Sequence, residues 1–213
     1  MKTFKYYNIK LIASFTLALC LLIPAFASAQ ETKNYFANGD WQFNAPLNND
    51  FANKASGWGM SFEGGYYVTP KLGVGLFIAY STNHKYIPTE TFNVSDNATI
   101  TTNQQHSLFQ LPFGLDLRYR FIPQSNYFDP YFGLKLGPEY TQISSYISTF
   151  QVYERKWGFY VSPEIGTNIW INSAKNVGLH LAVYYSFATN KAQVLNGSID
   201  KLNNIGFRVG LAF

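Results

Sequence analysis

The 213-residue sequence has a single cysteine, few charged residues and no apolar run long enough to cross a membrane as a helix. A membrane-spanning helix needs about 20 apolar residues. The mostly apolar run at residues 11–23 is only 13 residues long. One cysteine, Cys20, cannot form an internal disulfide framework. These absences exclude a helical membrane protein and a disulfide-stabilised scaffold.

The amino terminus has the organisation of a cleaved secretory signal peptide. Three lysines precede the apolar run, and the small residues Ala27-Ser28-Ala29 follow it as a cleavage site. We therefore expect residues 1–29 to be removed. The mature chain, residues 30–213, would then be one domain without cysteine.

The basic character of the sequence comes largely from this leader. Three of the 16 basic residues lie in it, so the mature chain has 13 basic and 12 acidic residues and a net charge of +1. This balance gives no electrostatic reason for a nucleic-acid partner, and we expect none. The abundant residues are instead 19 Phe, 16 Tyr and 16 Gly, a composition typical of a lipid-facing β-barrel.

Segments in which every second residue is apolar recur along the mature chain, and turn residues separate them. The pattern predicts eight strands that begin at about residue 40, the first of them faint. Pro112 lies inside the fourth strand, and because proline cannot donate a ladder hydrogen bond, we expect a local bulge there. The predicted strands cover about residues 41–45, 57–68, 72–81, 109–121, 131–139, 157–171, 177–187 and 205–213.

The connections between these strands alternate in length. Short turns on one side and long loops on the other are typical of an up-and-down barrel in an outer membrane. An even number of strands lets the last strand pair with the first. The predicted turns are residues 69–71, 122–126 and 172–176, and the predicted loops are residues 46–56, 82–105, 141–154 and 188–201.

The last strand ends on an aromatic residue. Phe207, Val209, Leu211 and Phe213 share one face, and the sequence stops at Phe213. This pattern resembles the C-terminal signature of Gram-negative outer-membrane β-barrel proteins, and residues 38–213 resemble the small eight-stranded barrels of the OmpA and OmpX kind. The resemblance implies an all-β, eight-stranded antiparallel up-and-down transmembrane β-barrel, with the signature read by the barrel-assembly machinery. We expect no periplasmic domain after the barrel.

The charged residues of the strands lie on the phase opposite the large apolar side chains. Because Arg or Lys facing lipid at the midplane costs roughly 2–4 kcal/mol, this phase is predicted to face the lumen. A secreted lipocalin-type barrel would expose the same phase to water, but soluble surfaces are usually rich in Lys and Glu rather than Gly. The predicted interior ion cluster consists of Glu63, Asp116, Arg118, Lys135, Glu164 and Arg208.

The three histidines suggest little chemistry. His180 lies on the inner phase, and no second His or Cys stands at metal-binding spacing, so we expect no metal or cofactor. His84 and the His106-Ser107 pair fall near the outer ends of the third and fourth strands. Lipid-modifying barrel enzymes place a Ser, a His and an acid at that level, but the spacing here does not single out a triad. We expect no catalytic residue.

The sequence therefore predicts a non-enzymatic integral outer-membrane protein, structural or surface-interacting, with a charged and plugged interior. A small-solute channel and a lipid-modifying enzyme are the alternatives. The expected partners are outer-membrane lipid, lipopolysaccharide and the barrel-assembly machinery. Residues 82–105 form the best candidate loop for an extracellular ligand, because loops on rigid scaffolds commonly carry binding. We expect a monomer.

Overall fold

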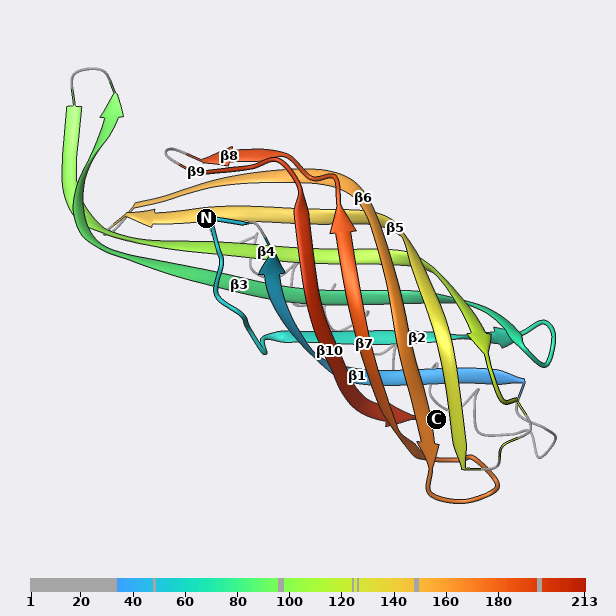
Figure 1. The fold of residues 1–213 in the computed structure, drawn as a ribbon. Helices are drawn as coiled ribbons and strands as arrows, with labels where there is room; N and C mark the ends of the chain where they lie inside the picture. The colour runs from blue at the N-terminus through green and yellow to red at the C-terminus, as the bar shows by residue number, and fades with distance from the viewer. Residues whose placement is uncertain are drawn as a thin grey trace, which may run out of the picture. The chain divides into compact units, whose positions relative to one another are not determined.

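The structure, a computed structural model, describes residues 34–47, 49–95, 98–123, 125, 127–147, 150–194 and 197–213 (Figure 1). The predicted signal peptide lies outside these described residues. Within them, no helix is long and apolar enough to span a membrane. The strands are β1 Tyr35–Leu47, β2 Gly59–Tyr67, β3 Leu72–Ser95, β4 Ala98–Arg120, β5 Phe128–Ile147, β6 Phe150–Trp170, β7 Gly178–Ala188, β8 Ala192–Val194, β9 Gly197–Ile199 and β10 Leu202–Ala212.

Eight of these strands form a closed antiparallel barrel in the order β1-β10-β7-β6-β5-β4-β3-β2. Strands β8 and β9 form a separate two-stranded hairpin. The barrel closes through β1 and β10, where Phe43 pairs with Phe207. The eight-stranded up-and-down topology predicted from the sequence is confirmed. The first strand starts earlier than predicted, at Tyr35 rather than about residue 40.

The two phases of each barrel strand face different surroundings. Large apolar side chains point outward, and Leu76 and Ile165 are 65% and 66% exposed. Polar and charged side chains point inward and are buried. Exposed apolar positions on the outside of a closed barrel are what hydrocarbon requires. Five aromatic side chains that the pattern places on the inner phase are buried: Phe77, Tyr131, Tyr160, Trp170 and Tyr184.

The long polar stretches are not the loops that the sequence predicted. Residues 82–95 continue β3, residues 98–105 belong to β4, and residues 141–154 are largely strand in β5 and β6. Threonine favours strands because its branched side chain packs on a pleated surface. The hydroxyls of Thr91 and Thr101 approach to 2.6 Å across the β3–β4 ladder. The result is a four-stranded sheet that continues past the barrel.

The bulge predicted at Pro112 is wrong. Pro112 pairs with Glu139 and Leu115 pairs with Leu136, so the β4–β5 register is the same on both sides and no residue is inserted. The irregularity is taken up by Gly114, whose φ of 154° is unfavourable for other residues. A Cβ atom there would lie 2.8 Å from the Gly137 Cα and would overlap the Leu136 carbonyl oxygen.

Replacing Gly114 by alanine should therefore destabilise the barrel by about 1–3 kcal/mol, the usual cost of one strained backbone position. Urea titration of the protein folded in lipid vesicles measures this change. Gly64→Ala is the matched control, because a Cβ atom there meets nothing closer than 3.5 Å. Equal stability of the two variants would contradict this account of Gly114.

Candidate functional site

The centre of the lumen holds the residues predicted as the interior ion cluster. Lys135 Nζ lies 2.6 Å from Glu63 Oε2 and 2.5 Å from Glu164 Oε2, so one ammonium group bridges two carboxylates from β2 and β6. All three side chains are fully buried. A buried ion pair needs such close geometry to offset the loss of hydration.

Two arginines extend this bridge on either side. Arg118 forms an ion pair with Glu63 and lies 3.7 Å from Asp116 Oδ2. Arg208, on the closing strand, forms an ion pair with Glu164. Each of these side chains is inaccessible to solvent. The structure thus brings together all six residues of the interior ion cluster, from five strands of the barrel.

Aromatic rings and glycines shape the space around the interior ion cluster. The Arg118 guanidinium lies between the rings of Phe36 and Tyr131, at 4.1 and 3.9 Å from their centroids. Such cation–π contacts partly replace the lost hydration of the cation. At Gly133 a Cβ atom would stand 2.7 Å from Glu164 Cγ, so a glycine makes room for that carboxylate.

A second buried group, which the sequence analysis did not find, joins the interior ion cluster. His180 Nδ1 lies 2.6 Å from Asp40 Oδ1, and His180 Nε2 lies 2.7 Å from the Tyr131 hydroxyl. That hydroxyl donates to Glu164 Oε1 at 3.0 Å. His180 thus links Asp40 to Tyr131 and Glu164 through a chain of short polar contacts.

The enlarged group contains four carboxylates, and the side chains of Arg118, Lys135 and Arg208 lie among them, with His180 beside Asp40. Nearer the periplasmic turns, Arg120 forms a two-pronged pair with Asp129 at 2.8 and 2.6 Å. The sequence pattern did not predict the pairing of Asp40 with His180 or of Asp129 with Arg120. Asp40 lies in the faint first strand, and Asp129 lies at a strand end.

Two sets of these buried side chains lie as close together as the ligands of a metal ion would. Their ligand atoms lie within 4.8 Å of one another in Asp40, Glu63 and His180, and in Glu63, Asp116 and Glu164. In the second set the Lys135 ammonium already bridges two carboxylates, and in the first His180 is bonded to Asp40. Ion pairing accounts for both sets.

Above the interior ion cluster lies a layer of polar side chains, which we call the polar layer. Glu139 is buried there, and its Oε1 accepts hydrogen bonds from Thr141 and Gln110 at 3.0 and 3.3 Å. Asn44 and Asn83 exchange amide hydrogen bonds of 2.9 and 3.2 Å. The layer encloses a space of about 10 Å³, no more than one water molecule needs.

The extracellular end of the lumen is covered by two connections, which we call the cap. One is residues 49–57, and the other is the β8–β9 hairpin. The sequence analysis treated both as loops, because short irregular segments have no periodicity to read. Their buried apolar side chains pack with inward-facing residues of the long strands. The cluster comprises Phe51, Ala52, Phe77, Leu108, Ile143, Tyr160, Ala188, Ala192, Val194, Ile199 and Leu202.

His106 fastens the cap. Its ring stacks on Phe51 with centroids 4.2 Å apart, and its Nδ1 lies 3.0 Å from the Phe51 carbonyl oxygen. Burial lowers the pKa of the His106 imidazole against the opposing effect of that hydrogen bond, and nearby Lys85 lowers it further. Lys85 Nζ also donates to the Asp50 carbonyl oxygen at 2.6 Å. His106 thus has a packing role in the cap.

The residues considered for a catalytic triad are not assembled as one. His84 and Ser107 are cross-strand partners, so they share the outer face of the β3–β4 ladder, whereas His106 is on the opposite face. In the described part of the chain, no acidic residue is hydrogen-bonded to the side chain of His84 or Ser107. The hydrogen bonds of a proton relay are therefore not formed between these residues.

The C-terminal signature lies on the outside of the barrel. Phe207, Val209, Leu211 and Phe213 are between 37% and 51% exposed, on the same outward phase. Phe213 is held to the first strand by backbone hydrogen bonds in both directions with Ala37, at 2.8 and 3.3 Å.

The family model described as outer membrane protein beta-barrel domain matches residues 13–213. Neisserial surface protein A (NspA) shares 12% identity at a TM-score of 0.50, over 84% of this chain and 96% of that chain. OprG from Pseudomonas aeruginosa shares 18% identity at a TM-score of 0.46, over 84% and 93%. Ail of Yersinia pestis, solved in complex with the heparin analogue sucrose octasulfate, shares 12% at 0.43, over 84% and 97%. These likenesses concern the fold. No curated protein sequence matches the chain.

Lys135→Met should destabilise the folded barrel by about 3–5 kcal/mol, because it leaves two buried carboxylates without their shared cation. Equilibrium unfolding in lipid vesicles measures the loss. The control is Lys156→Met, which breaks a pair that is 47% exposed on the lysine side and should change stability by less than about 1 kcal/mol. If Lys135→Met were as mild as the control, the interior ion cluster would not hold the lumen together.

Proposed function

Because the chain belongs to the outer membrane protein beta-barrel domain family, we propose that it is a non-enzymatic integral outer-membrane protein with a plugged lumen and a partner-binding extracellular sheet. Family membership gives the location in the outer membrane. The observation that carries the proposal is the fully buried bridge of Lys135 between Glu63 and Glu164, which crosses the lumen from β2 to β6.

A plugged lumen argues against the small-solute channel. An eight-stranded barrel has an interior just wide enough for side chains to fill it. Here the interior ion cluster fills the middle, the polar layer lies above it, and the cap covers the outer end. A solute would have to displace all three, and each displacement exposes an unpaired charge or apolar surface.

The extracellular sheet supports a binding role at the cell surface. The pairing of β3 with β2 ends at Ser81, although β3 continues to Ser95. An edge strand offers backbone donors and acceptors to an added strand of a partner. The outward face of this sheet presents the exposed rings of Tyr86, Tyr146 and Tyr153. This proposal keeps the predicted binding region at residues 82–105 but replaces a loop with a strand edge.

The enzyme alternative has less support. A nucleophilic serine needs a hydrogen-bonded base that a third group orients. Ser107 and His84 share a face but have no such acidic partner among the described residues, and His106 is engaged with Phe51 in the cap. The exposed β-sheet edge needs no such chemistry to act as a binding surface.

Purified protein inserted into a planar lipid bilayer should give no unitary conductance steps, because buried side chains of the interior ion cluster and the cap fill the lumen. The double variant Glu164→Gln with Arg208→Gln should also stay silent, since its amide side chains and the remaining members of the interior ion cluster still occupy most of the space. Discrete steps from the wild-type protein would overturn the plugged lumen. Steps from the double variant alone would show that the ion pair is a gate.

A further inference from the structure

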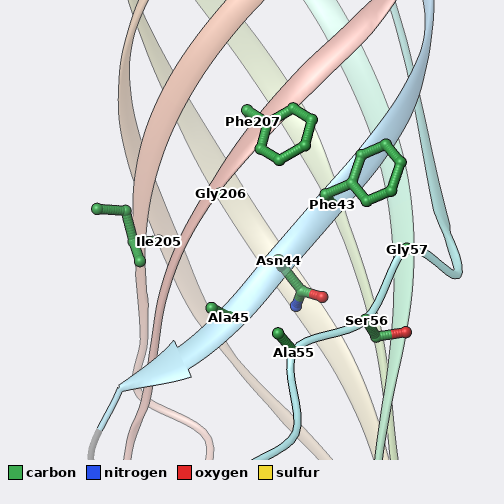
Figure 2. Close-up of a pocket in the computed structure, with 9 residues that line it drawn as sticks. All are labelled: Phe43, Asn44, Ala45, Ala55, Ser56, Gly57, Ile205, Gly206 and Phe207. Carbon is green, nitrogen blue, oxygen red and sulfur yellow. The ribbon is translucent and has the colours of Figure 1, made fainter.

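An apolar groove lies on the outside of the barrel at its closing seam. Figure 2 shows Phe43 and Ala45 on β1, Ile205 and Phe207 on β10, and the chain segment 55–57 that borders them. The groove has a volume of about 270 Å³. The groove is thus a concave surface on the outer side of the barrel wall.

The segment 55–57 is fixed in place rather than lying loosely on the barrel. The backbones of Asn44 and Ser56 exchange two hydrogen bonds of 2.9 Å. The Trp41 indole nitrogen donates to the Gly57 carbonyl oxygen. A Cβ atom at Gly57 would stand 2.6 Å from Phe43 Cε1, so a glycine lets this wall touch the ring below it.

The floor of the groove is equally ordered. The rings of Trp41, Phe43 and Phe207 stack in sequence, with centroids 5.9 and 4.6 Å apart and planes tilted by 12° in each pair. Phe207 and Ile205 are almost half exposed toward the groove and the surrounding membrane. The walls and floor are therefore formed by groups that hold their shape without an occupant.

The groove opens toward the lipid near the outer interface of the membrane. It lies on the outward phase of β1 and β10, next to the exposed tryptophans Trp41 and Trp58. Tryptophan is enriched at the interface, where its ring is in the hydrocarbon and its N–H meets polar groups. A hydrocarbon chain of a membrane lipid can enter the groove from this side.

The volume of the groove and the charge at its border indicate which kind of occupant fits. Pockets for compact drug-sized ligands usually measure about 300–1,000 Å³, so the groove suits one narrow chain better than a bulky ring system. Lys54 directly precedes the wall and is exposed, and it forms no ion pair within the described residues. A cation at the membrane surface attracts the phosphate of an anionic lipid.

We infer that the groove holds one acyl chain of lipid A, the phosphorylated and acylated anchor of lipopolysaccharide, with a phosphate group of the same molecule at Lys54. The groove is at the extracellular end of β1, and lipopolysaccharide is in the outer leaflet. This inference rests on the outer-membrane location of the family and not on the plugged lumen, so the two can fail separately.

Mass spectrometry of the intact protein released from detergent micelles, after incubation with purified lipid A, tests the site. The wild-type protein should retain one lipid A molecule. Ala55→Trp, which fills the groove from an exposed position, should retain at least about tenfold less. Leu76→Trp adds the same bulk to the lipid-facing surface of β3 and should retain lipid A like the wild type. Lys54→Gln should weaken retention severalfold while the apolar groove remains.

Heat-dependent gel migration of each variant establishes that it is folded before binding is scored. Folded wild-type protein that retains no lipid A would overturn the inference, as would Ala55→Trp that retains as much as the wild type. Equal retention of phosphatidylglycerol would overturn the assignment to lipid A. A dimer that Ala55→Trp dissociates would show that the occupant is a second copy of the chain.

Discussion

The cost of burying charge inside a narrow barrel governs the rest of the structure. An eight-stranded lumen leaves no room for hydrated side chains, so each charged group must find a protein partner. The Lys135 ammonium satisfies two carboxylates at once, and Arg118 and Arg208 complete the set. Once this interior is paired, the barrel has a buried polar centre, and the proposed plugged lumen rests on it.

The same constraint decides what remains outside. With polar groups directed inward, the outer phase is left apolar, and the groove beside Phe43 and Phe207 lies on it. Functional surfaces are then available at two places, the outer face of the barrel and the sheet that rises from it. Both can bind a partner without disturbing the interior ion cluster, because neither shares a side chain with it.

Sequence alternation was sufficient to predict the ring of strands, because a period of two separates the lipid phase from the lumen phase. It also placed Glu63, Asp116 and Lys135 on one phase. Asp116 pairs with Lys135 across the β4–β5 ladder, and Glu63 meets Lys135 across the lumen. The pattern could not find Asp40, because the inward positions of β1 are as polar as a loop. The pattern placed His180 on the inner phase but gave no sign that it is the partner of Asp40, because His180 looks like any other inward residue of β7.

The extracellular half was harder to predict for a related physical reason. Above the membrane neither face of β3–β6 contacts lipid, so the strands lose their apolar alternation and resemble polar loops. Thr91 and Thr101 show that cross-strand contacts, not burial, define these strands. The packing of the cap was not predicted from the sequence, because Phe51 is a lone aromatic residue in an irregular segment. Its partner, His106, is 55 residues away in the chain.

Water access to the centre of the lumen tests the closed interior most directly. The mature chain would be free of cysteine, so a single cysteine can report on one position. Ser61 is fully buried beside Asp40 on the next strand, and its hydroxyl has no hydrogen-bond partner. In the folded protein, Ser61→Cys should resist a small water-soluble methanethiosulfonate reagent that rapidly labels Ser198→Cys on the exposed β8–β9 hairpin. Comparable labelling rates at the two positions would contradict the plugged lumen.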